Sequence, residues 1–394
     1  MKEKRRNLSF AAMKRETTGY YHQTVLFGET VRAFIPTPLP PTPPLELDET
    51  LCALLDKAAL ALGRLDGISA VLPDPQFFLY SYVRQEAVLS SQIEGTQSSF
   101  SDLICHELHN APTPRNDDIS EVSRYVNAME YGLGQINAGN PLSLRLLCEV
   151  HRRLVGDGRG ADKEPGTFRR SQNWIGGTRP GNALFVPPPP DAVIECAGAL
   201  EKFINNIPPT ITRPIIKAAL AHVQFETIHP FLDGNGRLGR LLITLLLCAE
   251  GILRQPMLYL SLHFKRHRDD YYRLLQNVRV QGEWEEWLRF FLEGVVETAE
   301  TAARTAQKLL QVFEKDRALL AGANNTVRRM FGELQKRPAI TAAAAGKKLV
   351  VSNPTARKAI AALETLGILR EITGGTYRRV YVYDAYLDAV NTPQ

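Results

Sequence analysis

The sequence has little cysteine, no long apolar run and no glycine-rich loop that ends in Lys-Ser or Lys-Thr. Its five cysteines lie far apart and include no CxxC pair, which favours reduced thiols in the cytoplasm over a disulfide or zinc framework. The longest apolar stretches, such as residues 241–249, are shorter than the roughly 20 residues that cross a bilayer. The N-terminus lacks the apolar segment of about 7–15 residues that a signal peptide requires. We therefore expect a cytoplasmic protein without a membrane segment, and a P-loop is excluded.

The composition is that of an ordinary globular protein with a basic C-terminal fifth. Apolar residues make up 44% and charged residues 23% of the 394 residues, which argues against global disorder and allows two or three domains. The net charge of the whole chain is +5. Residues 321–394 alone contain 11 Lys and Arg against 5 Asp and Glu, so a polyanion-binding surface is expected there if anywhere.

Apolar spacing predicts a mainly α-helical chain after an irregular start. Residues 1–30 are polar and basic and are interpreted as a loose arm, and the six prolines within 34–47 favour an extended strap. Gly63 is expected to end the first helix and Gly95 to break the second. The predicted helices cover residues 49–62, 77–104, 142–154, 191–204, 213–228, 237–251, 270–281 and 283–296, and a connecting helix covers 298–315.

The most informative segment is HPFLDGNGRLGR, residues 229–240, which lies between two predicted helices. Gly234 and Gly236 permit positive φ and close backbone approach, so consecutive N–H groups can point into one concavity. The following helix adds unpaired N–H groups and the positive end of its dipole, and together these form an anion site. Arg237 and Arg240 reach the same side of the first turn. Two arginines over such a nest suit a polyphosphate better than a carboxylate.

A metal ligand and a base lie beside this nest. Asp233 offers a hard oxygen ligand with which Mg²⁺ can bridge phosphates, and His229 can take a proton near neutral pH. The segment therefore predicts a nucleotidyl or phosphoryl transfer site. Each residue taken alone fits an ordinary helix start with surface ion pairs equally well, but the fixed order of the whole string argues against that alternative.

This segment resembles the signature HPFx[D/E]GNGRxxR of Fic proteins and matches it at every specified position. The resemblance implies transfer of AMP from ATP to a hydroxyl side chain of a target protein, with pyrophosphate leaving. Relatives with altered motifs phosphorylate or transfer phosphocholine, and this sequence does not depart from the AMPylating pattern. The implied roles are general base for His229, loop anchor for Phe231, Mg²⁺ ligand for Asp233, anion hole for Gly234, Asn235 and Gly236, phosphate-chain binding for Arg237 and γ-phosphate binding for Arg240.

Residues 165–177, PGTFRRSQNWIGG, are predicted to form a small surface hairpin. The segment resembles the flap over the Fic active site, and the resemblance implies that it pairs with the backbone of the target as an added strand. An ordinary surface hairpin is the alternative. The candidate docking residues are Asn173, Trp174, Ile175 and Gly176.

Ser90, Glu94 and Gly95 match the family's inhibitory motif [S/T]xxxE[G/N]. Gly95 is a natural helix cap. The helix dipole disfavours a carboxylate in the last turn by a few tenths to about 1 kcal/mol, so Glu94 invites a cationic partner. The resemblance implies that Glu94 pairs with Arg240 and occupies the γ-phosphate position, while Ser90 holds the inhibitory helix. In some relatives the same glutamate helps to remove AMP from targets.

The tail resembles a winged helix-turn-helix, a module often appended to Fic proteins of this class. Helices are predicted over residues 326–335, 339–348 and 352–367, and strands over 368–372 and 377–383. The candidate DNA contacts are the basic side chains that are expected to be exposed on the recognition helix and on the wing, namely Arg357, Lys358, Arg378 and Arg379. Winged helices also serve as dimerisation or docking modules, and that alternative stays open.

Two further groups of residues also allow plainer explanations. Tyr259, Tyr271 and Tyr272 either line a nucleotide pocket or pack in the core. His263 and His267 have metal-ligand spacing, but their segment offers no convincing third ligand, so no zinc site is predicted.

The sequence thus predicts a mainly α-helical Fic protein that adenylylates target proteins, and itself, with ATP and Mg²⁺ under restraint by Glu94. A homodimer is a possible assembly. The alternatives are a DNA-binding regulator whose Fic core senses nucleotide, and a Fic enzyme that mainly removes AMP. The predicted parts are the arm (1–30), a Fic-associated region (31–112), the catalytic core (113–297), the connecting helix (298–322) and the winged helix (323–394).

Overall fold

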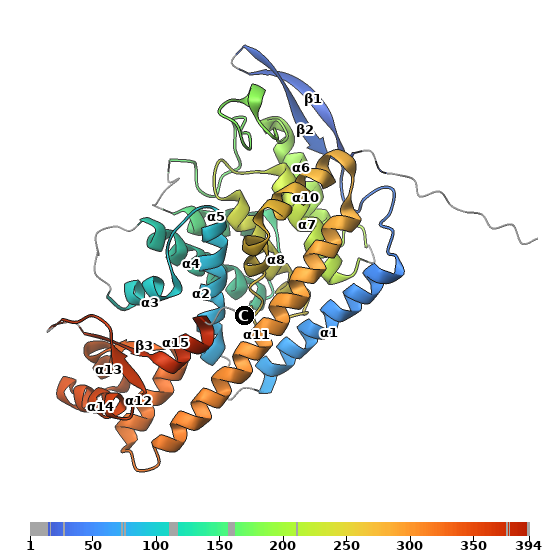
Figure 1. The fold of residues 1–394 in the computed structure, drawn as a ribbon. Coiled ribbons are helices and arrows are strands. Elements are labelled where there is room, and N and C mark those ends of the chain that lie inside the picture. Colours follow the sequence, from blue (N-terminus) through green and yellow to red (C-terminus); the bar gives the residue numbers. More distant parts are fainter. Residues whose placement is uncertain are drawn as a thin grey trace, which may run out of the picture.

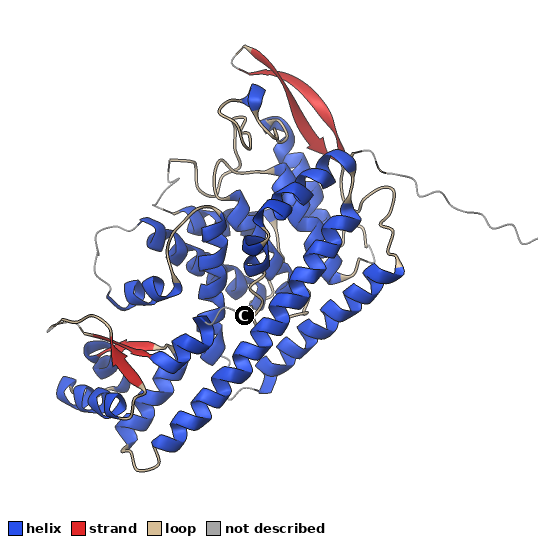
Figure 2. Cartoon of the chain, in the orientation of Figure 1, coloured by secondary structure: helices blue, strands red, loops and turns tan. Residues whose placement is uncertain are grey.

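The computed structural model describes residues 15, 17–26, 28–71, 74, 76–109, 117–156, 162–209, 212–375, 377 and 379–391. These residues form a helical body with a two-stranded hairpin at one end and a small helix–sheet module at the other (Figures 1 and 2). The prediction of a mainly α-helical fold is confirmed. In the part of the chain that is described, no helix is long and apolar enough to cross a membrane. All five cysteines are free thiols, and the cytoplasmic location stays a prediction.

The N-terminal hairpin corrects the interpretation of residues 1–30 as a loose arm. Strands β1 (Gly19–Leu26) and β2 (Glu29–Pro36) pair antiparallel. Both strands are rich in aromatic and β-branched residues, which favour pairing, and Gly28 takes φ 82° in the turn. The first 14 residues of the predicted arm lie outside the described residues. Residues 37–48 form neither helix nor strand, and residues 34–36 of the predicted strap belong to β2, so an extended strap over the rest stays a prediction.

Helix α1 (Glu49–Val71) packs along α11 (Trp284–Leu319), and both depart from the predicted bounds. Gly63 does not end α1, because Leu62 and Leu65 continue its buried stripe and a glycine inside a helix costs only about 1 kcal/mol. The two helices predicted over 283–296 and 298–315 are one continuous helix, so there is no separate connecting helix.

The inhibitory segment lies between two helices that were predicted as one with a break. Helix α2 (Gln76–Ile93) ends just before Gly95, which takes φ 101°, and α3 (Phe100–His109) follows. The predicted break at Gly95 is therefore confirmed. Helix α4 (Asp117–Asn137), for which no helix was predicted, packs against α2 and α5 (Leu144–Val155).

Helix α8 (Asn235–Ala249) lies at the centre of the body, as its apolar sequence predicts. It pairs with α7 (Pro214–Ile228), and residues 238–247 are all buried. Around this pair lie α6 (Pro190–Ile204), α9 (Ser261–Arg266) and α10 (Arg268–Gln281). The loop between α7 and α8 is thus anchored at both ends by helices that lie in the centre of the core.

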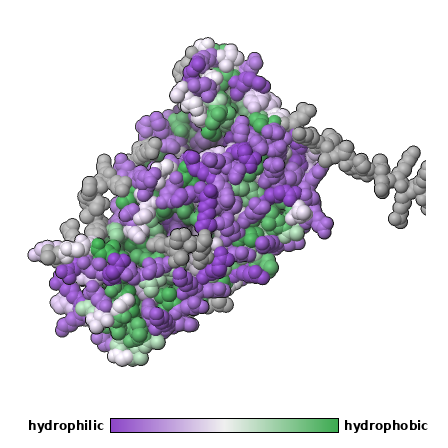
Figure 3. All heavy atoms as spheres, viewed as in Figure 1, coloured by the Kyte–Doolittle hydropathy of each residue, from purple (hydrophilic) through white to green (hydrophobic). Residues whose placement is uncertain are grey.

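The C-terminal module alternates helices with a three-stranded antiparallel sheet of order β3-β5-β4. Tyr383 donates a hydrogen bond to Asp316 of α11 at 2.6 Å, and Tyr386 donates one to the carbonyl oxygen of Phe77 in α2 at 2.9 Å. The predicted helix 339–348 loses its first residues to β3. Hydrophobic side chains gather at this end of the face in Figure 3. Identification as a winged helix stays a prediction. The elements are α12 (Asn325–Lys336), β3 (Ala339–Thr341), α13 (Ala342–Leu349), α14 (Asn353–Thr365), β4 (Leu369–Glu371), β5 (Val380–Tyr383) and α15 (Asp384–Asn391).

Candidate active site

The loop between α7 and α8 begins with a histidine in a left-handed conformation. His229 caps α7 with φ 48° and ψ 59°, and its backbone N–H donates to the carbonyl oxygen of Phe225 at 2.9 Å. The following proline predicts the helix end correctly. The left-handed backbone is uncommon outside glycine and ends the helical path of α7 at this residue.

The interior of the loop is locked by the side chain of Asn235. Its Oδ1 accepts from the backbone N–H of Phe231 at 2.9 Å, and its Nδ2 donates to the carbonyl oxygen of the same residue at 2.8 Å. The Phe231 ring is fully buried and stacks on His151 with centroids 3.8 Å apart. The predicted anchor therefore lies in the core, and the Asn235 amide acts on the loop, leaving only its backbone N–H for an anion.

Two residues that the sequence analysis missed also hold the loop. His151 of α5 contacts the carbonyl oxygen of Asp233 through Nε2 at 2.9 Å, and its Nδ1 accepts from the N–H of Gly166 at 2.8 Å. This pair of contacts fixes the tautomer with the proton on Nε2, and burial lowers the pKa of His151 to about 4. Arg169 is buried and donates to the carbonyl oxygen of His229 at 2.9 Å. Nothing in their local sequence marks either residue.

The His229 imidazole is neutral and, in the part of the chain that is described, has one free ring nitrogen. Burial, reinforced by the nearby Arg279 and Arg169, lowers its pKa to about 3. Its Nδ1 is buried and has no hydrogen-bond partner among the described residues. A ring that stays unprotonated at neutral pH and has a free nitrogen can accept a proton from a substrate.

A cavity of about 240 Å³ opens beside this ring. Gly234 enters α8 with φ 73°, and a Cβ at Gly236 would clash with the Glu94 carboxylate. The glycines therefore allow the backbone of the helix start to line the cavity, as predicted for an anion site. The lining residues are Glu94, Glu121, His229, Leu232, Asp233, Gly234, Asn235, Gly236 and Arg237.

Asp233 and Arg237 both line this cavity but differ in exposure. The Asp233 side chain is 40% exposed, and its Oδ1 accepts from the Gly234 N–H at 2.6 Å. The Arg237 guanidinium is buried against Glu121 of α4 at 2.7 Å and lies 3.8 Å from Asp233. The Asp233 carboxylate at the rim of the cavity and the Glu121 carboxylate nearby offer oxygen ligands of the kind that Mg²⁺ prefers. Glu121 is a partner that the sequence analysis did not find.

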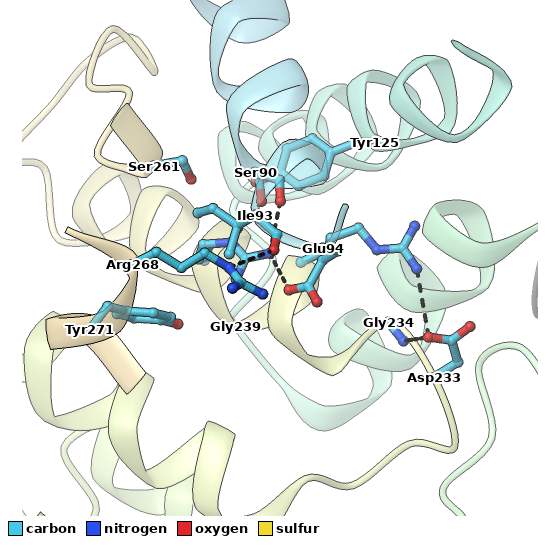
Figure 4. Close-up of polar contacts among 12 residues, drawn as sticks. Ser90, Ile93, Glu94, Tyr125, Asp233, Gly234, Gly239, Ser261, Arg268 and Tyr271 are labelled. Carbon is cyan, nitrogen blue, oxygen red and sulfur yellow. Dashed lines mark hydrogen bonds and ion pairs between the residues drawn. The ribbon is translucent and has the colours of Figure 1, made fainter. Parts of the chain in front are cut away.

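The predicted inhibitory residues meet Arg240 directly. Arg240 is buried, and its Nη2 lies 2.7 Å from Oε1 of Glu94. Its Nε donates to the Ser90 hydroxyl at 2.8 Å, and its Nη2 donates to the Ser90 carbonyl oxygen at 3.0 Å. Figure 4 shows Glu94 extending from the end of α2 toward the loop that carries Asp233 and Gly234. Residues 150 positions apart in the sequence are thus joined into one cluster.

Charge and burial oppose each other in this pair. Burial would raise the pKa of the Glu94 carboxyl, but Arg240 outweighs burial and lowers that pKa below its ordinary value. Burial disfavours the charged guanidinium of Arg240, and Glu94 reverses this and raises its pKa. Both groups are therefore charged at neutral pH, and each stabilises the other.

The predicted hairpin within residues 165–177 is wrong in its pairing. Ile175 pairs with Phe185 as an isolated bridge, in which the Ile175 N–H donates to the Phe185 carbonyl oxygen at 2.8 Å. Gly176 and Gly177 take positive φ and turn the chain toward residues that follow them, so the partner lies after the glycines. Trp174 packs against a small apolar cluster that includes Val31, Ala33 and Val186, and Asn173 donates to the Phe231 carbonyl oxygen at 3.0 Å.

The remaining candidates divide between core and surface. Tyr259 and Tyr271 are buried in the core, whereas Tyr272 is 38% exposed. Among the DNA-contact candidates, Arg357 and Lys358 are exposed near the start of α14. Arg379 is also exposed and donates to the Gly375 carbonyl oxygen at 2.8 Å, and Arg378 lies outside the described residues.

Comparison with known families matches two adjacent parts of the chain. Residues 52–134 match the Fic/DOC family N-terminal model, and residues 141–247 match the Fic/DOC family model. The protein adenylyltransferase Fic of Aedes aegypti is 34% identical over 179 residues, which is 45% of this chain and 32% of that protein. The protein of the same name from Drosophila melanogaster is 30% identical over 183 residues, 46% of this chain and 34% of that protein. The match thus spans about a third of the length of these relatives.

Solved structures share the fold at low sequence identity. A Fic family protein from Desulfovibrio desulfuricans G20 has a TM-score of 0.56 and 19% identity, and the match covers 86% of this chain and 97% of that one. A Fic domain-containing signaling protein from Bacteroides thetaiotaomicron has a TM-score of 0.52 and 16% identity, covering 64% and 97%. These likenesses concern the fold alone.

Proposed function

The chain carries a Fic N-terminal domain and a Fic domain, and on this premise we propose that it is an Mg²⁺-dependent protein adenylyltransferase. It transfers AMP from ATP to a hydroxyl side chain of target proteins and of itself. The observation that carries the proposal is the neutral His229 ring with an unpaired buried nitrogen beside a glycine-lined cavity at the start of α8. Curated relatives with the name protein adenylyltransferase Fic support it.

In the proposed reaction the triphosphate of ATP lies against the backbone N–H groups at the start of α8. The His229 ring takes the proton of the acceptor hydroxyl, whose oxygen attacks the α-phosphorus. A new oxygen–phosphorus bond forms, the bond between the α-phosphorus and the bridging oxygen breaks, and pyrophosphate leaves. Asp233 would hold Mg²⁺, which when bound neutralises charge on the phosphates. Residues 173–176 are the proposed docking edge for the target.

We propose that Glu94 restrains this reaction. Arg240 is the proposed partner of the γ-phosphate, and it is occupied by the Glu94 carboxylate at 2.7 Å. A triphosphate must displace that carboxylate or bind with its phosphates out of line for attack. Since the pair is buried on the arginine side and charge-assisted, the restraint holds until something withdraws Glu94 from the cavity.

Incubation of the full chain with labelled ATP and Mg²⁺ tests both parts of the proposal. Glu94→Gly should raise AMP incorporation, measured by labelling and by the mass of the adduct. Adding His229→Ala to that variant should reduce incorporation by about 10²-fold or more, the range for loss of a general base. Gln97→Gly, an exposed change in the same loop, is the matched control and should label like the wild type.

Two results would contradict the proposal separately. Equal labelling of wild type and Glu94→Gly would contradict the proposed restraint but not the proposed adenylyltransferase activity. If Glu94→Gly forms no AMP adduct, either on itself or on proteins of a cell extract, the proposed adenylyltransferase activity is contradicted.

A second function concerns the C-terminal module, which we propose to be a winged helix that binds DNA. Arg357 and Lys358 are exposed near the N-terminus of α14, where a recognition helix presents residues to a major groove. The observation favours DNA over a purely structural module because the tail also holds the basic excess of the chain.

A further inference from the structure

Three groups that commonly ligate transition metals meet where α9, α10 and α11 join. His263 belongs to α9, His267 lies between α9 and α10, and Glu297 belongs to α11. One ligand atom of each residue lies within 4.8 Å of the other two. None of the three belongs to the 229–240 loop or to the inhibitory segment, so the cluster is separate from the proposed active site.

The local fold explains how the two rings come together. The backbone N–H of His267 donates to the carbonyl oxygen of His263 at 3.0 Å, so one helical turn places both rings on the same side. Their centroids are 4.7 Å apart. Glu297 follows thirty residues after His267, and its Oε2 lies 2.6 Å from Nδ1 of His263. The third ligand is thus supplied by helix packing and not by sequence spacing.

The surroundings hold this cluster in place. Arg266 contacts Oε1 of Glu297 at 2.5 Å and leaves Oε2 directed at His263. The Phe290 ring lies 4.7 Å from the His263 ring and shields it from water. A Cβ at Gly294 of α11 would lie 2.6 Å from the His263 ring, so the glycine makes room for it. Such supporting contacts orient metal ligands in known sites.

The 2.6 Å contact between Nδ1 of His263 and Oε2 of Glu297 needs either a proton or a metal ion between the two atoms, because each of them otherwise presents a lone pair. A proton satisfies it, and so does a metal ion that draws in the second imidazole as well. Two imidazole nitrogens and one carboxylate oxygen form the ligand set that zinc takes with one open position. Mg²⁺ and Ca²⁺ prefer oxygen ligands alone.

We propose that His263, His267 and Glu297 bind one divalent transition metal ion of the zinc class, with the remaining coordination position facing solvent beside the exposed His267. The ligand atoms would move apart to surround the ion at bond lengths of about 2.0–2.2 Å. The ion would tie the corner between α9 and α10 to α11. That corner also contacts the end of α2, through Lys265 to Gln92 at 2.7 Å and Arg268 to the Ile93 carbonyl oxygen at 3.2 Å.

Titration of the full-length chain with Zn²⁺ tests the site. The protein is freed of any histidine tag and of metal by chelation, and binding is followed by calorimetry and by the visible absorption of Co²⁺. We expect one equivalent to bind and to raise the thermal unfolding midpoint. His267→Ala and Glu297→Gln should each weaken Zn²⁺ binding by at least about tenfold, and neither should gain the thermal shift.

Two control variants locate the bound ion. His22→Ala removes an exposed histidine of β1 and should bind Zn²⁺ as the wild type does. Asp233→Ala removes the proposed Mg²⁺ ligand of the active site and should also keep the Zn²⁺ equivalent. The proposal is overturned if the wild type binds no Zn²⁺, or if His267→Ala and Glu297→Gln bind it as tightly as the wild type does.

Discussion

At the scale of single residues, the hydroxyl of Ser90 is one of three polar groups that contact the buried guanidinium of Arg240. The Ser90 Oγ accepts from Nε of Arg240 at 2.8 Å inside the protein. The adjacent Ser91 is equally buried, but its Oγ has no hydrogen-bond partner among the described residues. The Ser90 hydroxyl thus contacts Arg240 and also the Tyr125 hydroxyl, whereas the Ser91 hydroxyl has neither contact, so the two neighbouring serines can be compared directly.

We expect Ser90→Ala to lower the free energy of unfolding by about 1.5–3 kcal/mol, the range for a hydrogen bond to a charged group. Ser91→Ala should change it by less than about 0.5 kcal/mol, because no bond is lost. Urea unfolding of the two variants and of the wild type measures both values. Equal destabilisation by the two changes would show that helix packing, and not the contact to Arg240, determines the effect.

The lowered pKa of His229 leads to a second prediction at this scale, which concerns the dependence of stability on pH. Burial lowers the pKa of His229 to about 3, from an ordinary value of 6.5. Between these values the unfolded chain binds a proton that the folded chain does not, so the free energy of unfolding falls as the pH falls through this window. One such group contributes a slope of up to about 1.4 kcal/mol per pH unit.

His229→Asn should make this slope shallower by up to that amount. Asparagine tolerates the left-handed backbone of the position, so the fold is kept. Denaturant unfolding at several pH values from about 4 to 7 gives the slopes, and His22→Asn, in which the lost ring is exposed, serves as the control. An unchanged slope in His229→Asn would mean that the ring is protonated in the folded protein.

At the scale of helices, the packing of α7 against α8 leaves a carboxyl group in the core. Glu226 of α7 is buried where a Cβ at Gly239 of α8 would clash with it. Its Oε1 lacks a hydrogen-bond partner within the described structure. Burial raises the pKa of this carboxyl to about 7, although Arg240 opposes the shift. The close contact of α7 with α8 therefore buries the Glu226 carboxyl group, and this burial disfavours its charged form.

Glu226→Gln should stabilise the protein increasingly as the pH rises. Because the folded-state pKa of Glu226 lies above its ordinary 4.5, the folded wild type binds an extra proton between pH 4.5 and 7 and loses stability across that window. The glutamine does not titrate, so its advantage should grow up to about pH 7 and then level off. Unfolding free energies at matched pH values measure it, with the exposed Glu195→Gln as the control. A pH-independent difference would contradict the assignment of a buried acid.

Helices α5 to α8 were predictable within one or two residues because local signals mark their ends. Pro214 begins α7, and the pair His229-Pro230 ends it. The hairpin of β1 and β2 was missed, by contrast, because residues 1–30 as a whole are polar and basic, and the aromatic and β-branched residues of β1 were interpreted together with them. Helix α4 carries two acids in its first turn and many polar residues, so its apolar side becomes evident only when it packs on α2 and α5.

The candidate site divides in the same way. The residues of the 229–240 loop were predictable because their chemistry depends on a fixed local order. The residues that support them, Glu121, His151 and Arg169, come from α4, α5 and the segment before α6. Their distances along the chain carry no signal, so only the fold identifies them.

At the scale of the whole molecule, α2 contacts both the residues of the proposed restraint and the C-terminal module. Its last turn carries Ser90, and Glu94 follows directly after the helix. Both residues contact Arg240. Closer to its start, Phe77 accepts a hydrogen bond from Tyr386, and Gln85 donates one to the Val390 carbonyl oxygen at 3.2 Å. The C-terminal module therefore contacts the same helix whose last turn carries Ser90 of the proposed restraint.

The positive charge of the C-terminal module predicts that its ligand is DNA. Replacing both Arg357 and Lys358, which are exposed near the start of α14, by alanine should weaken binding to duplex DNA. It should also lower the slope of log affinity against log salt by about 0.9 for each phosphate contact that is lost. Fluorescence anisotropy at several salt concentrations measures both quantities. The double change Lys57→Ala and Arg64→Ala removes the same charge from the exposed side of α1 and should leave the slope unchanged. Equal slopes for the two double variants would instead favour non-specific attraction and a module that docks protein.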